Sequence, residues 1–336
     1  MMWQGKRKGL MDPQQIKKVR IARLSIISNT TLMILKLITG FVIGSVSIIS
    51  EAIHSGVDLL AAIIAYAAIK ISGKPADHEH PFGHGKIENI SGTVEALLIF
   101  LAAGWIIYEA VKKIINPTPI EALSWGVGVM LFSSIINWIV SHMLFTVGEE
   151  TDSIALKADA WHLRTDVYTS VGVMCGLFII WVGRYFFPDL SIQWIDPIAA
   201  LAVAIVIIRT AYKLTVQSSR DLMDMKLPAD EENYIRNLIA SMYPKVHGYH
   251  RLRTRKAGSN RFIEFHMKVA PDMTVEDSHA ITHEIKQQIV EHFSESSVTI
   301  HVEPCDGKCQ NDCLKHCLLS EEEQKKVRRR TDFQKH

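Results

Sequence analysis

Long apolar runs recur along the first two thirds of the chain, and they constrain its fold more than any other feature. Each is about 20 residues long, roughly what an α-helix needs to cross the hydrocarbon core of a membrane. They cover residues 24–42, 47–69, 90–111, 123–144, 155–182 and 195–208. These runs lack the polar–apolar alternation of barrel strands, so the sequence predicts an all-α membrane domain of six transmembrane helices.

The composition indicates that a polar domain is joined to these helices. Hydrophobic residues make up 48% of the 336 residues, yet 21% are charged. The formal net charge of +2 gives no signal for nucleic-acid binding. We expect four segments: a basic arm at 1–20, the transmembrane domain at 21–216, a soluble domain at 217–304 and a polar, loosely ordered tail at 305–336.

Basic residues predict the orientation in the membrane. The first 23 residues hold seven Lys and Arg against a single Asp, and further basic residues lie in the second connection and after the sixth run. The connections on the opposite side are poorer in charge, although Lys112 and Lys113 run against the trend. The positive-inside rule then places both termini in the cytoplasm.

The soluble domain shows a different pattern. Residues 230–243 and 275–293 have helical periodicity, and residues 250–256, 261–269 and 298–302 read as strands. The order α-β-β-α-β predicts a compact cytoplasmic α+β domain, with two helices on one face of a sheet.

Ionisable residues inside two of the apolar runs repeat one spacing. His54-x-x-x-Asp58 and His162-x-x-x-Asp166 each place an imidazole and a carboxylate on one helical face, one turn apart. Either pair alone could equally be a structural hydrogen bond or a proton relay. Two copies favour a joint metal site, with the N₂O₂ ligand set that suits tetrahedral Zn²⁺. The roles of Glu51, Asp159 and Arg164 stay open.

A second candidate lies between the second and third runs. The segment from Asp77 to Lys86 reads Asp-His-Glu-His-Pro-Phe-Gly-His-Gly-Lys. Three His and two acidic residues around a Pro–Gly turn suit a metal ion, and a solvated His-rich loop is the alternative.

Together the six apolar runs, the paired His-x-x-x-Asp faces, the Phe-Gly-His-Gly-Lys loop and the α-β-β-α-β domain resemble the cation diffusion facilitator family, over residues 18–304. The resemblance implies a ferredoxin-like, metallochaperone-like cytoplasmic domain. It also implies a homodimer in the cell membrane that exports a divalent transition metal in exchange for protons.

The resemblance also implies three sets of metal ligands. The transport site is His54, Asp58, His162 and Asp166; the loop site is Asp77, His80 and His84; the cytoplasmic site is His250, His266, His301 and Glu303, with His279 as a possible addition. Glu303 stands where the family often has Asp. Lys86 and Asp224 stand where relatives form a charge interlock at the dimer junction.

The His at the first transport position resembles zinc-preferring members, and imidazole suits Zn²⁺ better than harder ions. Cd²⁺, Co²⁺, Fe²⁺ and Mn²⁺ stay open. We expect the metal as substrate and regulator, with no organic cofactor and with lipid, protons and a second copy as partners. A membrane metal sensor without transport is the alternative, and a membrane metalloenzyme is disfavoured because no His-Glu-x-x-His motif is present.

The tail carries a pattern that the family resemblance does not explain. Cys305, Cys309, Cys313 and Cys317 recur every four residues. This spacing brings neighbouring thiols together in a helix and differs from the paired Cys-x-x-Cys of a zinc ribbon. Reduced thiolates there form a possible accessory site for Zn²⁺, Cd²⁺ or Cu⁺, with an iron–sulfur cluster as a less favoured reading.

Overall fold

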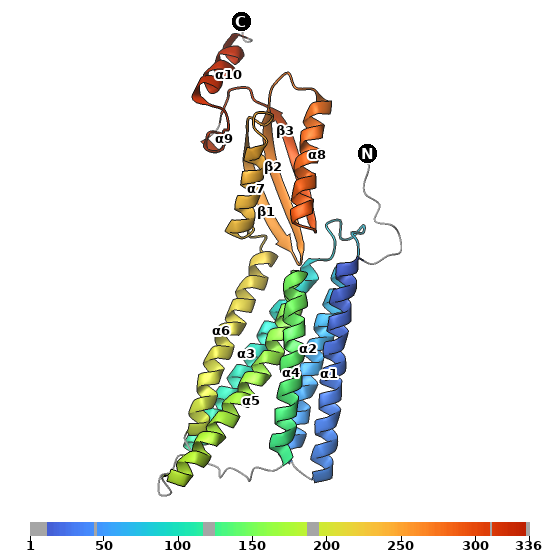
Figure 1. Cartoon of the computed structure of the whole chain (residues 1–336), viewed down its shortest axis with the longest axis vertical. Helices are drawn as coiled ribbons and strands as arrows, with labels where there is room; N and C mark the ends of the chain where they lie inside the picture. Colours follow the sequence, from blue (N-terminus) through green and yellow to red (C-terminus); the bar gives the residue numbers. More distant parts are fainter. Residues whose placement is uncertain (1–11, 44–45, 117–124, 187–194, 310, 334–336) are drawn as a thin grey trace. The chain divides into compact units, whose positions relative to one another are not determined.

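The structure is a computed structural model that describes residues 12–43, 46–116, 125–186, 195–309 and 311–333 (Figure 1). It divides into two compact units, Met1–Leu222 and Met223–His336. The described part of the first unit is helical: α1 is Pro13–Ile43, α2 is Val46–Ser72, α3 is Lys86–Ile115, α4 is Trp125–Glu150, α5 is Ile154–Phe186 and α6 is Ile195–Leu222.

The prediction of a helical membrane region is confirmed. Five of these helices, α1, α2, α3, α4 and α6, are long and apolar enough to cross a membrane. Helix α5 is 33 residues long but carries four charged residues in its first half, Lys157, Asp159, Arg164 and Asp166. A sixth span along α5 stays a prediction, and the start of the fourth predicted run, 123–124, lies outside the described residues.

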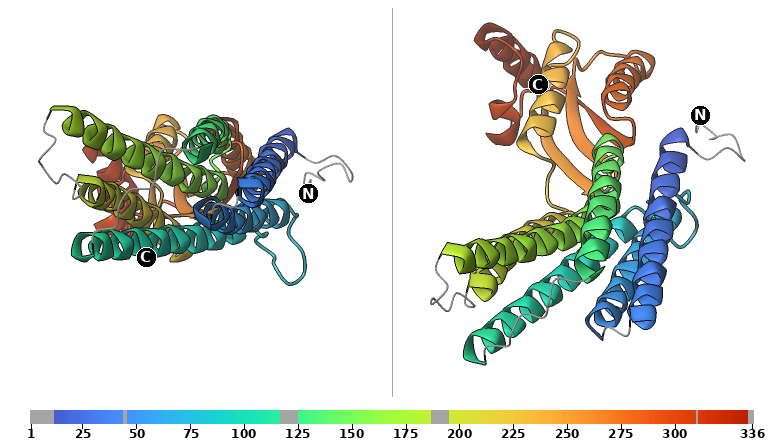
Figure 2. Two further views of the ribbon diagram at one scale, coloured as in Figure 1. Left: turned by 90° about the horizontal axis from the view of Figure 1, so that it is seen from below. Right: turned by 60° about the horizontal axis from the view of Figure 1, so that its bottom comes forward.

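Small residues line the contacts between the helices of this unit. Figure 2 shows these helices packed side by side. Ala96 and Ala103 of α3 and Ala211 of α6 are buried in one apolar cluster. Small side chains let helix backbones approach closely inside a membrane. Large apolar side chains such as Trp105 and Trp138 are exposed, as expected of a surface that faces lipid.

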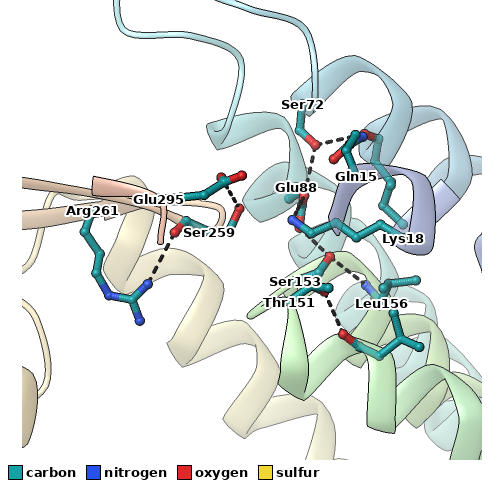
Figure 3. Close-up of polar contacts among 12 residues, drawn as sticks. Gln15, Lys18, Ser72, Glu88, Thr151, Ser153, Leu156, Ser259, Arg261 and Glu295 are labelled. Carbon is teal, nitrogen blue, oxygen red and sulfur yellow. Dashed lines mark hydrogen bonds and ion pairs between the residues drawn. The ribbon is translucent and has the colours of Figure 1, made fainter. Parts of the chain in front are cut away.

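A buried carboxylate joins four segments at one end of the helices (Figure 3). Glu88, in the first turn of α3, is 1% exposed. Its Oε1 atom lies 3.3 Å from Lys18 Nζ of α1 and accepts a hydrogen bond from Ser72 of α2 at 2.9 Å. Its Oε2 atom accepts a hydrogen bond from Ser153 at 2.5 Å. Ser153 immediately precedes α5, so a single side chain fixes the spacing of α1, α2, α3 and α5.

The second unit has the predicted α-β-β-α-β order. It consists of α7 (Ala229–Ser241), β1 (Gly248–Ala257), β2 (Asn260–Val269), α8 (Val275–His292) and β3 (Ser296–Pro304). The strand order is β1-β2-β3, with β1 antiparallel and β3 parallel to β2. One apolar core joins alternate residues of β2, from Ile263 to Val269, to isoleucines of both helices. Both helices therefore cover the same face of the sheet.

The expectation of a loosely ordered tail was wrong for its described residues. Helices α9 (Asn311–Lys315) and α10 (Glu321–Phe333) follow β3. The tail docks on β1 through a bridge between Cys317 and Gly248, and Leu318 N donates to His247 O at 2.9 Å. Leu318 also packs against the core of the unit, which gives the polar segment an apolar anchor.

Candidate metal centres

The two predicted His-x-x-x-Asp faces meet between α2 and α5. His162 Nε2 lies 3.1 Å from Asp58 Oδ1, and His54 Nε2 lies 4.0 Å from Asp166 Oδ1. Ligand atoms of His54, Asp58 and Asp166 all lie within 4.8 Å of one another. The structure therefore brings the four predicted transport residues into one group, with each imidazole facing the carboxylate of the other helix.

The four side chains differ in exposure. Those of His162 and Asp58 are both 6% exposed, whereas His54 is 51% exposed and Asp166 is 19% exposed. The group is therefore closed on the His162 side and open on the His54 side. An open ligand position is typical of sites where an ion must enter and leave.

A buried acid that was not predicted from the sequence lies beside this group. Glu95 of α3 is 0% exposed, accepts a hydrogen bond from Ser91 at 2.9 Å, and lies close enough to Asp159 and His162 for their charges to interact. The sequence did contain the feature that marks Glu95 as a functional candidate, because it is an acidic residue within an apolar run. Asp159, whose role was left open, is also 0% exposed.

The loop between α2 and α3 brings its three predicted ligands together. Both His80 Nδ1 and His84 Nε2 lie 3.3 Å from a carboxylate oxygen of Asp77, and the two rings are 4.4 Å apart. The His80 backbone N–H donates to Asp77 and holds the pKa of that carboxyl below its usual value. Gly83 makes the turn with a φ of 84°, which favours glycine.

Three imidazoles of the second unit form one row across the sheet. His250 of β1 pairs with His266 of β2, which pairs in turn with His301 of β3. The core lies on the opposite face, because Phe265 and Met267 point into it and alternate residues of a strand face opposite ways. Neighbouring ring centroids are 5.0 and 4.7 Å apart.

All three imidazoles converge on Glu303. Its oxygens lie 2.7 Å from His266 Nδ1, 3.4 Å from His250 Nε2 and 3.6 Å from His301 Nε2. Burial alone would raise the pKa of Glu303, but hydrogen bonds from Lys268 and His266 lower it to about 2. Burial lowers the pKa of His250, which favours its neutral form. An ionised carboxylate beside neutral imidazole is the state that binds a metal cation.

The remaining predicted residues lie elsewhere. His279 is exposed on α8, which covers the opposite face of the sheet, so the structure does not bring it to the His250 cluster. Lys86 starts α3 and donates to Leu222 O at 3.4 Å, and Asp224 Oδ1 lies 3.3 Å from Arg255. The proposed interlock spans the two units and stays a prediction.

Comparison with known proteins agrees with this arrangement. Residues 22–223 match the "Cation efflux transmembrane domain" and residues 227–305 the "Cation efflux protein, cytoplasmic domain". The chain is 36% identical to the uncharacterized transporter sll1263 of Synechocystis, covering 85% of this chain and 92% of that protein. It is 30% identical to the cation-efflux pump FieF of Yersinia pestis, over 88% of this chain and 96% of that protein.

Solved structures of cytoplasmic domains from metal transporters resemble part of the chain. The metal-bound C-terminal domain of the CzcD transporter from Thermotoga maritima is 33% identical over 23% of this chain and 94% of that one, with a TM-score of 0.21. One domain of long apolar helices joined to a small cytoplasmic domain defines a class, the membrane cation transporters. Within that class the chain belongs to the cation diffusion facilitator family. It is a multi-pass cation efflux transporter rather than an enzyme, and its second unit is the family's dimerisation domain.

Proposed function

We propose that this transporter exports a divalent transition-metal cation, with Zn²⁺ favoured, in exchange for protons. The convergence of His54, Asp58, His162 and Asp166 between α2 and α5 carries the proposal. Two imidazoles and two carboxylates match the preference of Zn²⁺ for four nitrogen and oxygen ligands. The chain works as a homodimer in the cell membrane with both termini in the cytoplasm, and Lys86 and Asp224 interlock at the dimer junction.

Proton coupling follows from the chemistry of these ligands. A metal binds neutral imidazole and ionised carboxylate, so each bound cation displaces protons, and a proton taken up later expels the cation. Histidine ordinarily titrates near neutral pH, which suits it to this exchange. Alternating access follows when α2 and α5 move so that the site opens first to the cytoplasm and then outward.

The test is zinc uptake by liposomes that contain the purified protein, driven by an imposed pH gradient. We expect Asp58→Asn and Asp166→Asn to abolish uptake, because each removes an anionic ligand and keeps the shape of the side chain. Glu109→Gln is the matched control, since Glu109 is a half-exposed acid of α3 paired with Lys112 away from the site. Proton-driven uptake by both Asp variants would refute the site, and a wild-type protein that binds zinc without uptake would favour the sensor.

The cytoplasmic cluster gives the transporter a regulatory site. A cation held by His250, His266 and Glu303 neutralises the charge of Glu303 and ties β1, β2 and β3 together. Because this unit is the dimerisation domain, occupancy is linked to the association of two copies. The loop group of Asp77, His80 and His84 is a third, more exposed site for the same ion.

A further inference from the structure

Both carboxylate oxygens of Glu303 have partners among the protein's own side chains. Its Oε1 atom accepts a hydrogen bond from His266 Nδ1 at 2.7 Å. Its Oε2 atom lies 2.7 Å from Lys268 Nζ. The same Oε2 atom faces His250, at 3.4 Å from Nε2. Lys268 therefore binds the oxygen that a cation shared by His250 and Glu303 would need.

The sheet places Lys268 beside this carboxylate. Lys268 follows His266 by two residues on β2, so both side chains project from the face opposite the apolar core. The register pairs Lys268 directly with Glu303 on β3. The Lys268 side chain is only 13% exposed, and its Nζ atom also donates to Pro304 O at 3.3 Å. Two adjacent residues of β3 thus hold the ammonium group at the end of the histidine row.

The space beside Glu303 is rich in positive charge. A cavity of about 110 Å³ is lined by His250, Arg251, Lys268, Glu303, Lys308 and Cys313. Arg251, Lys268 and Lys308 are cationic at neutral pH, and Glu303 is the acidic member of this wall. A divalent cation that enters the cavity is therefore repelled by fixed charges of its own sign.

The tail contributes to this wall without forming a cysteine site of its own. Its residues Lys308 and Cys313 line the cavity. The N–H of Arg251 donates to Asp312 Oδ2 at 2.9 Å, which holds α9 against β1. Within the part of the chain that the structure describes, no group of three close metal-ligand atoms includes a cysteine. The metal site that the tail borders is therefore the histidine row.

One buried nitrogen next to Glu303 has no hydrogen-bond partner. His250 is 8% exposed, and its Nε2 atom faces Glu303 Oε2 without a hydrogen bond to it. Buried polar atoms are normally paired, so this nitrogen is a position where a ligand is expected. Ligand atoms of His250, His266 and Glu303 lie within 4.8 Å of one another. A metal ion among them would pair Nε2 and would repel the ammonium group from Oε2.

We propose that Lys268 is a tethered cation that competes with the metal for Glu303 and sets the metal concentration at which the cytoplasmic site fills. The inference rests on the proposed metal site of His250, His266 and Glu303. Metal entry breaks the ion pair of Lys268 with Glu303, and the ammonium group keeps its contact with Pro304 O as it turns towards solvent. Because this exchange opposes binding, the site fills only as metal accumulates, which suits a regulatory site in an efflux transporter.

The test measures Zn²⁺ binding by the full-length protein in detergent, with a chelating dye as competitor. Asp58→Asn and Asp77→Asn form the background, because each removes an anionic ligand from one of the other two sites. In this background Lys268→Met should lower the Kd by at least about tenfold, since the competing charge is gone. Lys268→Arg keeps the charge and should bind no more tightly than the parent. Lys245→Met is the control and should leave the Kd unchanged, because Lys245 is exposed and paired with Glu284.

A second measurement follows Lys268 itself in the wild-type protein. Its amine is acetylated with an N-hydroxysuccinimide ester, and the modified residue is located by mass spectrometry. Acetylation of Lys268 should become several-fold faster when Zn²⁺ is added, because the amine leaves Glu303 and becomes exposed. His266→Gln should abolish this acceleration, and acetylation of Lys245 should not respond to Zn²⁺.

The outcomes separate this inference from the metal site on which it rests. If Zn²⁺ binding weakens in His266→Gln but is equal in Lys268→Met and the parent, the site stands and the role of Lys268 is overturned. Tighter binding in Lys268→Arg, or acetylation of wild-type Lys268 that ignores Zn²⁺, would also overturn it. If Zn²⁺ binding does not depend on His266, with or without Lys268, the cytoplasmic site and the competition both fail.

Discussion

His54 and His162 have the same spacing to an aspartate but different surroundings. His162 is buried against Asp58, whereas His54 is half-exposed and 4.0 Å from Asp166. The more exposed ligand is the one whose replacement the fold tolerates best. Selectivity is therefore best changed at His54, and the integrity of the site is best probed at Asp58.

We expect His54→Asp to shift the preference of the transporter from Zn²⁺ towards Mn²⁺. A third carboxylate makes the ligand set harder, and loss of the imidazole should lower zinc affinity by at least about tenfold. Competitive uptake of the two ions into liposomes measures the shift. His142→Asp, on α4, is a control for a new acid in the same unit; an unchanged metal preference in His54→Asp would show that His54 is not a ligand.

Glu303 predicts an acid-dependent stability in the metal-free cytoplasmic unit. Its folded pKa of about 2 is below the ordinary 4.5, so the carboxylate stabilises the fold above pH 4.5 and loses this effect as pH falls towards 2. Glu303→Gln should flatten this part of the curve of unfolding free energy against pH. Glu276→Gln changes an exposed acid of α8 and is the control, so it should leave the curve unchanged. Equal curves for Glu303→Gln and the wild type would contradict the ion-pair geometry.

At the scale of elements, Glu88 links four segments through one buried carboxylate. A buried ion pair is weak evidence of net stability, but breaking it leaves an uncompensated charge. Because Lys18 and Glu88 come from α1 and α3, their pair holds helices in place on both sides of α2. Movement of α2 against α3 must therefore stretch or exchange the hydrogen bond between Ser72 and Glu88.

We expect Glu88→Leu to destabilise the first unit by about 3–5 kcal/mol, since Lys18 would stay buried without its carboxylate. The double variant Glu88→Leu, Lys18→Met should recover most of that loss. Denaturant unfolding in detergent, followed as a double-mutant cycle, measures both. The neighbouring exposed pair of Lys17 and Glu150 is the control, and its removal should cost no more than about 1 kcal/mol. Additive effects at Lys18 and Glu88 would show that the two do not interact.

The elements also show what sequence alone could predict. Helical spacing placed His54 and Asp58, and likewise His162 and Asp166, on single faces, and the structure brings the two faces together. The spacing in the sequence could not predict that each His meets the Asp of the other helix, because that pairing depends on how α2 and α5 pack. The histidine row depends on strand register across residues far apart in sequence. The docked tail was missed because composition does not show the backbone contacts that hold it.

At the scale of the whole molecule, the second unit has a core of its own. Its apolar cluster runs from Leu227 to Phe293 and joins α7, α8 and the sheet. A core of this kind allows a unit to fold independently of the helices before it. Residues 223–336 should therefore unfold cooperatively when produced alone, with a sigmoidal denaturation curve that does not depend on the spectroscopic probe. A gradual or probe-dependent transition would show that the unit needs the helices of the first.

Zinc should stabilise this isolated unit. A ligand present at 100 times its Kd adds about 2.7 kcal/mol when it binds only the folded state. His266→Gln should remove the part of the rise in Tm that is due to the histidine site, because His266 is the central imidazole of the row. His279→Gln should not, since His279 is exposed on the other side of the sheet. A loss of the zinc effect in His279→Gln would instead support a ligand role for that residue.

The row of His250, His266 and His301 also makes metal affinity a measure of folding fidelity. Each strand contributes one imidazole, and all three meet Glu303 only in the observed register. A slip of one residue in any strand would turn its imidazole to the helix-covered face. A refolded chain with normal helix and strand content but mispaired strands would therefore lose tight zinc binding, and a zinc titration would distinguish it from correctly folded protein.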